Sequence, residues 1–293
     1  MTHFFSGAGV ALITPFKEDG SIDFMALEHL VHEQITAGID YIVALGSTAE
    51  AATLSDSERK AVVSCIRTAV GGRRPLVVGI GGNHTQKVVE TVRTFDFSGI
   101  DGILSVVPYY NKPSQEGIFR HFKAIAEASP VPVILYDVPS RTGVKMLADT
   151  TLRLAAESRR IVAVKEASGD LEQVSDIVAG QPDHFRVISG DDALIVPIAA
   201  RGGGGVISVA ANAIPAKIRE LTALALTATE QAPALQHQLD ELCRLLFAEG
   251  NPTGIKALME ILGKAANILR LPLCPASPEL YHKLELCIKN LLP

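Results

Sequence analysis

Eight short runs of apolar and β-branched residues, separated by longer amphipathic segments, constrain the fold of this chain more than any other feature. Each run is apolar almost throughout, which is typical of strands covered on both faces in a parallel sheet. No G-x-G-x-x-G turn follows the first run, so eight strand–helix units predict a closed (β/α)8 TIM barrel rather than an open doubly wound sheet. The expected strands are Val10–Thr14, Tyr41–Gly46, Leu76–Ile80, Gly102–Val107, Val133–Val138, Ile161–Glu166, Arg186–Gly190 and Val206–Val209.

The helices between these runs have recognisable ends. Ser55 and Glu58 form a capping-box pattern, and the apolar stripe that follows stops at Gly71. A second helix is expected from Asp23 to Gly38. These signals support the alternation of strands and helices.

Beyond about residue 226 the strand signal ends and only helical patterns remain. We expect helices at Ala234–Ala248, Thr253–Leu269 and Pro278–Leu292, the last with Ser277 as its N-cap. Residues 1–225 are therefore predicted to form a catalytic barrel, and residues 226–293 a C-terminal three-helix appendix that serves packing or oligomer contacts.

Composition excludes several classes of function. A net charge of −5 over 293 residues, with no basic cluster, argues against a nucleic-acid partner. No apolar run reaches the length of a membrane span, and no export signal is visible at the start, so we expect a cytoplasmic protein with no membrane partner. The histidines are scattered without metal-ligand spacing, so neither a metal nor a cofactor is implied.

Lys165 is the strongest candidate for chemistry. Alternation along the sixth run points Ile161, Ala163 and Lys165 into the barrel. A lysine in apolar surroundings must find a partner or lose its charge, and a neutral amine can attack a carbonyl to form a Schiff base. The alternative is a structural ion pair with a carboxylate such as Glu166.

Other strand ends add polar groups at the same face of the barrel. Tyr136 shares the inward face of the fifth run and can transfer protons, although a core tyrosine is the alternative. Ser47 and Thr48 end the second run with two hydroxyls suited to a carboxylate, or simply form a polar loop. Gly190 ends the seventh run and permits close approach of a ligand.

Three segments carry a resemblance to a known family. They are VPYYNKPSQEG at residues 107–117, LYDVPSRTG at 135–143 and VKEASG at 164–169. With the strand-end motifs at 189–192 and 205–209, they resemble the pyruvate-dependent class I aldolases over nearly the whole chain. The resemblance implies a (β/α)8 barrel that needs no cofactor.

The resemblance also implies roles for individual residues. Lys165 matches the lysine that forms the imine with pyruvate, and Tyr136 matches the proton-transferring tyrosine. Thr48 matches a hydroxyl that links this tyrosine to one matching Tyr110, which a tight dimer inserts from the neighbouring subunit. Arg141 matches the arginine that holds the carboxylate of L-aspartate 4-semialdehyde. The remaining positions that match pocket-lining residues are Ser47, Gly190 and Ile207.

The same resemblance implies a homo-oligomer, a dimer of dimers, acting on pyruvate and L-aspartate 4-semialdehyde in lysine and diaminopimelate biosynthesis. Two rivals remain: a relative that cleaves sialic acid or a keto-deoxy sugar acid, and a barrel that binds a small acid without turnover. Arg141 and Tyr110 argue against the first, and intact Lys165, Tyr136 and Thr48 against the second.

Some positions depart from the family pattern. Ala49 replaces a usual glycine and Asp137 a usual asparagine, which bears on the choice of the second substrate. At the site where lysine inhibits some members, Asn83 and Tyr109 match. The departures there are Ala51, Asp56, Arg59 and Lys87, the last in place of a glutamate. We therefore expect weak or no inhibition by lysine.

Overall fold

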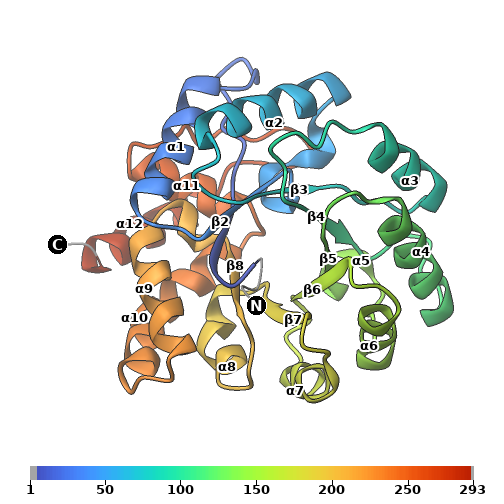
Figure 1. The fold of residues 1–293 in the computed structure, drawn as a ribbon. Coiled ribbons are helices and arrows are strands. Elements are labelled where there is room, and N and C mark those ends of the chain that lie inside the picture. Colours follow the sequence, from blue (N-terminus) through green and yellow to red (C-terminus); the bar gives the residue numbers. More distant parts are fainter. Residues whose placement is uncertain (1–4, 292–293) are drawn as a thin grey trace.

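The chain folds into a closed barrel of parallel strands surrounded by helices, and the computed structural model describes residues 5–291. The strands follow one another in sequence order, and the eighth pairs with the first (Figure 1). They are β1 (Gly7–Ala11), β2 (Tyr41–Ala44), β3 (Leu76–Gly79), β4 (Gly102–Val106), β5 (Val133–Asp137), β6 (Ile161–Glu166), β7 (Arg186–Ser189) and β8 (Gly205–Ser208). The predicted (β/α)8 barrel is confirmed.

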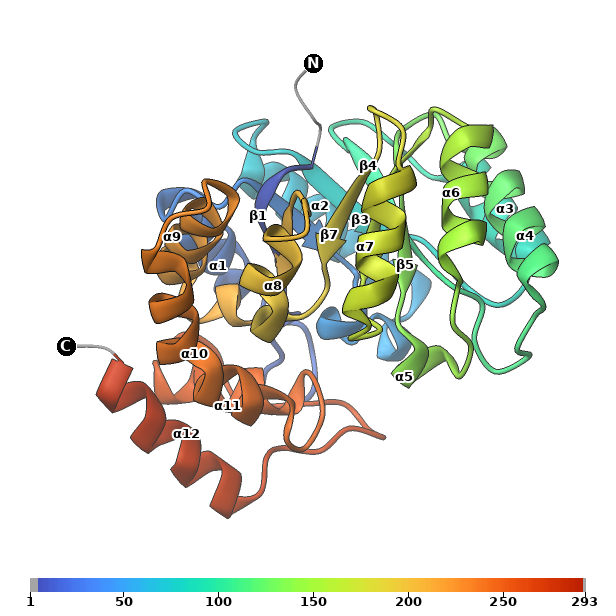
Figure 2. The same ribbon diagram turned by 90° about the horizontal axis from the view of Figure 1, so that it is seen from below.

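Helices cover the outside of the barrel, and the last of them gather at one end. In Figure 2, α11 and α12 lie toward the end of the barrel that carries α5, which follows directly after a strand. The helices are α1 (Phe24–Thr36), α2 (Asp56–Val70), α3 (Thr85–Thr94), α4 (Gln115–Ala128), α5 (Pro139–Thr142), α6 (Ala148–Glu157), α7 (Leu171–Gly180), α8 (Ile195–Ala199), α9 (Pro215–Leu226), α10 (Gln231–Phe247), α11 (Thr253–Ile261) and α12 (Pro278–Leu291). Short 3-10 turns are η1 (Ser47–Ala49), η2 (Ala51–Thr53), η3 (Asp192–Leu194) and η4 (Ala210–Asn212).

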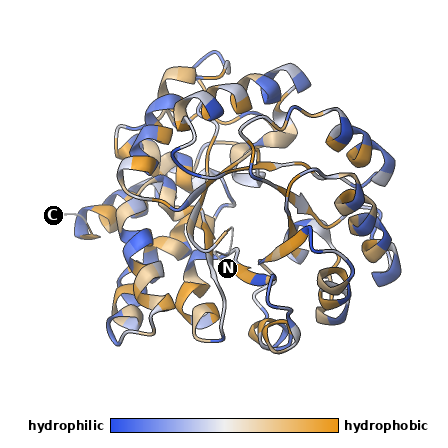
Figure 3. Ribbon diagram, in the orientation of Figure 1, coloured by the Kyte–Doolittle hydropathy of each residue, from blue (hydrophilic) through white to orange (hydrophobic). Residues whose placement is uncertain are grey.

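Apolar side chains fill two layers. The larger layer lies between strands and helices, so hydrophobic residues concentrate on the inner helix faces (Figure 3). The smaller layer fills the barrel interior with side chains that alternate along the strands. It consists of Phe5, Ala11, Tyr41, Val43, Val77, Leu104, Ile134, Tyr136, Val138, Ala163, Ile188 and Ile207. The interior is therefore a packed core, and polar chemistry is confined to its ends.

Three predicted helix starts are observed, whereas α10 begins at Gln231, three residues before the predicted Ala234. Ser55 accepts a hydrogen bond from the Glu58 amide, and the Glu58 carboxylate accepts one from the Ser55 amide, which completes the capping box of α2. Asp23 caps α1 through the Ala26 amide. Ser277 likewise accepts from the Leu280 amide at the start of α12.

The first strand begins earlier than predicted. β1 contains Gly7 and Gly9, whereas the apolar run was expected to begin at Val10. A Cβ on Gly9 would lie 2.3 Å from the Tyr41 ring, so only glycine lets that ring pack across the strand. The close packing requires glycines in the first part of β1, so this part of the strand lacks the large apolar residues on which the prediction was based. For the same reason β8 begins at Gly205, whose Cβ would lie 2.0 Å from the Gly7 carbonyl oxygen.

The prediction of a helix over Thr253–Leu269 was wrong at its end. α11 stops at Ile261, and Gly263 follows in the left-handed conformation with φ 67°. The chain beyond it runs without regular structure as far as α12. The expected final residue of α12, Leu292, lies outside the described residues. The division at residues 225 and 226 stays a prediction.

Candidate active site

A cavity of about 400 Å³ opens at the carboxyl ends of the strands, where barrel enzymes carry their sites. Segments from both the barrel and the C-terminal region line it. The lining includes Gly46, Ser47, Thr48, Tyr136, Val138, Ser140, Arg141, Lys165, Ala167, Gly190, Asp191, Val209, Phe247, Gly250, Asn251 and Leu273. The cavity thus collects most of the candidate residues.

Lys165 lies in the wall of this cavity with only 5% of its surface exposed. Burial lowers the pKa of its amine to about 8; the Asp192 charge opposes the shift and Arg141 reinforces it. At pH 7 an amine with that pKa is neutral in about one molecule in ten, against about one in 2,500 at an ordinary pKa near 10.4. Lys165 is therefore a competent nucleophile for a carbonyl carbon.

Glu166 does not neutralise Lys165. Its carboxylate accepts hydrogen bonds from the Ser168 amide and the Gln173 side chain, on the helix-facing side of β6. Among the described residues, no carboxylate lies within ion-pairing distance of the Lys165 amine. The geometry thus disfavours the structural alternative for this lysine.

Tyr136 stands beside Lys165 on the neighbouring strand. The two are register partners, and Lys165 Nζ lies 4.5 Å from the centre of the tyrosine ring. Burial raises the pKa of the Tyr136 phenol, while Arg141 and a hydrogen bond with the Ser47 side chain oppose that shift. The phenol is held protonated next to the amine, where it can donate a proton.

Ser47 and Thr48 occupy η1, directly after β2. Thr48 is buried, and its Oγ1 accepts a hydrogen bond of 2.9 Å from Asn251 Nδ2. The Tyr136 phenol hydrogen-bonds to the Ser47 side chain, and the predicted link between Thr48 and Tyr136 stays a prediction. Both hydroxyls nevertheless line the cavity.

Gly190 keeps the space around Lys165 open. A Cβ at this position would lie 3.1 Å from Lys165 Cε and 2.7 Å from Ala167 Cβ. Ile207, also expected at the pocket, instead lies fully buried in the barrel interior, and Val209 lines the cavity near the end of β8.

Arg141 lies exposed at the cavity mouth, on the short helix α5. Its guanidinium donates a hydrogen bond of 2.9 Å to the backbone carbonyl of Asn251. Asn251 therefore contacts both Arg141 and Thr48, although the sequence reading assigned it no role. Asn251 lies in the irregular segment between α10 and α11, where no periodic pattern marks individual residues.

Tyr110 lies outside the cavity. It follows β4 with a left-handed backbone, φ 73°, and 89% of its surface is exposed. Neighbouring Tyr109 is 43% exposed. Two adjacent aromatic residues are thus exposed on the surface of the single chain.

The two departures near the site have different effects. Ala49 is buried and does not adopt a left-handed conformation, so its Cβ imposes no backbone strain on the turn. Asp137 faces the helices and accepts hydrogen bonds from the Met146 amide and Gln173. Burial and the nearby Glu166 raise the pKa of Asp137 to about 7.

Neither a metal cluster nor a membrane span emerges from the described part of the chain. Residues 5–291 contain no group of three potential His, Cys, Asp or Glu ligands. None of their helices is long and apolar enough to cross a bilayer.

Comparison with known proteins places this geometry in context. The model of the dihydrodipicolinate synthetase family matches residues 4–291. A 4-hydroxy-tetrahydrodipicolinate synthase of Parabacteroides distasonis is 51% identical over 97% of this chain and 96% of its own. The crystal structure of the Aquifex aeolicus dihydrodipicolinate synthase superposes with a TM-score of 0.95 at 40% identity, covering 98% of both chains. A chloride-inhibited dihydrodipicolinate synthase from Acinetobacter baumannii, complexed with pyruvate, gives a TM-score of 0.93 at 40% identity over 97% of this chain and 98% of that one.

Proposed function

This chain belongs to the dihydrodipicolinate synthetase family, and we propose that it is a 4-hydroxy-tetrahydrodipicolinate synthase. In this proposal it condenses pyruvate with L-aspartate 4-semialdehyde through a Schiff base on Lys165. The observation that carries the proposal is the buried Lys165 amine, which lacks a carboxylate partner among the described residues and lies against the Tyr136 ring. Near-full-length likeness to synthases of that name supports it.

We propose the following order of steps. The neutral Lys165 amine attacks the keto carbon of pyruvate, and the resulting carbinolamine loses water to give an imine. Tyr136 supplies the proton that the leaving hydroxyl needs and later takes one from the methyl carbon. The enamine carbon then attacks the aldehyde of the second substrate, whose oxygen gains a proton as the new carbon–carbon bond forms. The amino group of that substrate finally attacks the imine carbon, which closes a ring, breaks the bond to Lys165 and releases the free amine.

Binding of the two acids is assigned to groups at either side of this centre. The hydroxyls of Ser47 and Thr48, together with the amides of their turn, suit the carboxylate of pyruvate. Arg141 at the mouth suits the carboxylate of the semialdehyde, because a guanidinium can bind both carboxylate oxygens. Gly190 leaves the space that the imine occupies beside Lys165.

We further propose a homo-oligomer, arranged as a dimer of dimers. Tyr110 would enter the site of the neighbouring subunit and extend the proton path from Thr48. Its exposure and left-handed backbone support a role outside its own chain. A cytoplasmic location is proposed as well; the four free cysteines fit a reducing compartment.

A comparison of acceptors tests the activity. Purified enzyme with pyruvate is assayed with L-aspartate 4-semialdehyde, N-acetylmannosamine and glyceraldehyde in separate reactions. The proposal expects the highest kcat/KM with the semialdehyde. A higher value with either sugar-type acceptor would assign the chain to the sialic acid or keto-deoxy sugar acid branch instead. No turnover with any acceptor would leave only a binding role.

A further inference from the structure

The turn that carries Ser47 and Thr48 is enclosed by two residues in a disfavoured backbone conformation. Leu45 has φ 55° and Glu50 has φ 53°, in the left-handed region that residues with a Cβ rarely adopt. Such residues persist only where surrounding contacts impose the conformation, and they concentrate at functional sites. The segment between them is therefore held by its surroundings rather than by its own preference.

Glu50 also buries a charge. Its carboxylate forms an ion pair with Lys256 of α11, and both side chains are fully buried. The second carboxylate oxygen accepts a hydrogen bond of 3.0 Å from the backbone amide of Arg270. Lys256 Nζ donates to the Ile268 carbonyl at 2.8 Å and lies 4.0 Å from the centre of the Phe16 ring. Each partner thus has polar contacts that compensate part of its desolvation.

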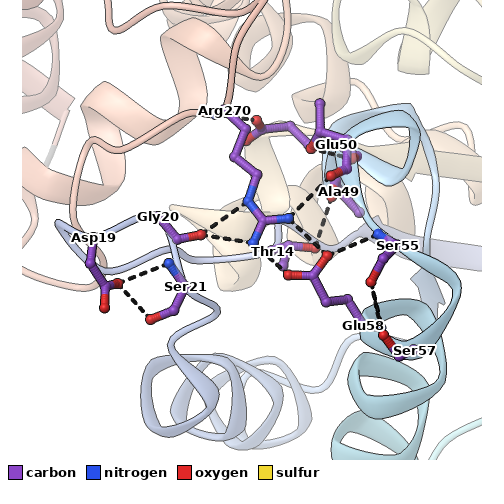
Figure 4. A network of polar contacts seen from close by, with 11 residues as sticks. Thr14, Asp19, Gly20, Ser21, Ala49, Glu50, Ser55, Ser57, Glu58 and Arg270 are labelled. Carbon is purple, nitrogen blue, oxygen red and sulfur yellow. Dashed lines mark hydrogen bonds and ion pairs between the residues drawn. The ribbon is translucent and has the colours of Figure 1, made fainter.

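Arg270 extends this network to two further segments. Its guanidinium donates to both carboxylate oxygens of Glu58, at the start of α2, and to the Gly20 carbonyl (Figure 4). It also lies 4.5 Å from the centre of the Phe16 ring. The network therefore joins the loop after β1, the start of α2 and the C-terminal region around the turn.

The C-terminal region also contacts the Thr48 hydroxyl directly, and the loop after β1 contacts the same turn. Asn251 Nδ2 donates to Thr48 Oγ1, and Thr14 donates to the Ala49 carbonyl at 2.8 Å. Thr48 is thus two residues from Glu50 and is held by the polypeptide that supplies Lys256. A displacement of either contact would move the Thr48 hydroxyl.

We propose that the Glu50–Lys256 ion pair is a brace that positions the Thr48 hydroxyl for proton transfer. Glu50 and Lys256 act through the turn and are positioning residues, and their role rests on the proposed function above. Stability alone does not require this arrangement. Glycine suits a left-handed position better than glutamate, and apolar residues often replace a buried ion pair without loss of stability.

The double variant Glu50→Met/Lys256→Met tests the brace, because it removes both charges and leaves neither partner unpaired. We expect a melting temperature within a few degrees of wild type and a kcat lowered by about 10-fold to 100-fold, the scale that small misplacements of reacting groups produce. The KM for pyruvate should change less than kcat, because carboxylate binding tolerates displacement better than proton transfer. The matched control is Lys123→Met/Glu157→Gln, which removes a half-exposed ion pair between α4 and α6 and should leave kcat unchanged.

A double variant with wild-type kcat would overturn the brace and leave the ion pair a stability element. If that variant does not fold, Glu50→Gln is assayed instead; it keeps the side-chain shape, and an unchanged kcat would overturn the proposal equally. A wild-type enzyme that forms no product from the semialdehyde would overturn the proposed function rather than the brace. In that case the brace is tested by the rate at which borohydride traps pyruvate on Lys165 in the same variants. A lower rate in the Glu50→Met/Lys256→Met variant supports the brace, and an unchanged rate overturns it.

Discussion

Tyr136 and Lys165 are direct register partners on adjacent strands, and the lysine amine lies 4.5 Å from the centre of the tyrosine ring. Burial acts on the two groups in a complementary way. It lowers the pKa of Lys165 to about 8 and raises the pKa of Tyr136. One environment therefore yields both a neutral nucleophile and a protonated acid, which are the two groups that imine formation needs.

Incubation with pyruvate and borohydride should inactivate the enzyme and add one reduced pyruvyl group per chain at Lys165. The reason is the neutral fraction of this amine in an open cavity. Peptide mass spectrometry locates the modification. Lys256 offers an internal control, because burial also lowers the pKa of its amine to about 8, yet it is closed off and paired with Glu50. Labelling of Lys256 in place of Lys165 would contradict the proposed mechanism.

Tyr136→Phe should lower kcat by about 10² to 10⁴ while the fold persists, because only the proton-transferring hydroxyl is lost. Steady-state kinetics with circular dichroism measures both effects. Tyr41→Phe is the matched control: its buried hydroxyl donates to the Val206 carbonyl away from the cavity lining. Equal losses of kcat in the two variants would show that Tyr136 acts through packing.

Tyr110→Phe should also impair turnover if the residue completes a neighbouring subunit's site. Mixing inactive Tyr110→Phe with inactive Lys165→Ala subunits should then restore part of the activity, because some mixed sites contain both intact residues. Native mass spectrometry verifies that subunits exchange. Exchange without any recovered activity would mean that the site is contained in one chain.

The sequence predicted the architecture, and the inward position of Lys165, for identifiable physical reasons. Strands buried on both faces must be apolar, so their runs were visible, and alternation along β6 correctly turned Lys165 inward. β1 was misplaced because its glycines make room for a ring from the next strand. Packing between segments that are distant in the sequence leaves no periodic hydrophobic pattern within either segment.

The C-terminal contribution to the site could not be predicted from periodicity either. Residues 226–293 were expected to serve packing or oligomer contacts, yet Phe247, Asn251 and Leu273 line the cavity. Asn251 reaches Thr48 across 203 positions of sequence, from an irregular segment between two helices. Such a contact depends on the path that the C-terminal segment takes across the open end of the barrel, and periodicity does not predict that path.

Asp137 makes stability depend on pH in a direction that can be tested. Burial and the nearby Glu166 charge raise the pKa of Asp137 to about 7 in the folded state, from an ordinary value of 3.8, while hydrogen bonds from the Met146 amide and Gln173 and the Lys145 charge oppose the rise. Between these pH values the unfolded chain loses the proton while the folded chain keeps it. The free energy of unfolding therefore falls as pH rises from about 4 to about 7, and the full cost is present above pH 7.

Asp137→Asn should remove this pH-dependent cost. Its gain in stability over wild type should be larger at pH 8 than at pH 5 by about 3 kcal/mol, or about 5 °C in Tm. Thermal melts at both values measure the difference. Asp149→Asn, an exposed position on α6, controls for the loss of one negative charge. A gain that is equal at pH 5 and pH 8 would show that Asp137 is ionised throughout this range.

Feedback by lysine is the remaining expectation from the sequence. Asn83 donates a hydrogen bond of 3.1 Å to the Tyr109 carbonyl, and Arg59 donates to the Ala51 carbonyl beside a second cavity. Lys87 is exposed on α3, where the resemblance places a glutamate that would pair with the ammonium of an inhibitor. The positions that match the inhibitor site thus carry two cations, Arg59 and Lys87, and no acid at position 87.

Free lysine should therefore inhibit this enzyme weakly or not at all. At an effective dielectric constant near 20, replacing attraction by repulsion between unit charges about 4 Å apart changes their energy by several kcal/mol, and each 1.4 kcal/mol is about tenfold in affinity. Lysine titrations at saturating pyruvate measure the effect, and Lys87→Glu should increase sensitivity at least tenfold. Half-inhibition of the wild type below about 1 mM, an affinity near 4 kcal/mol, would mean that other groups supply the missing charge and that the match to the inhibited pattern fails here.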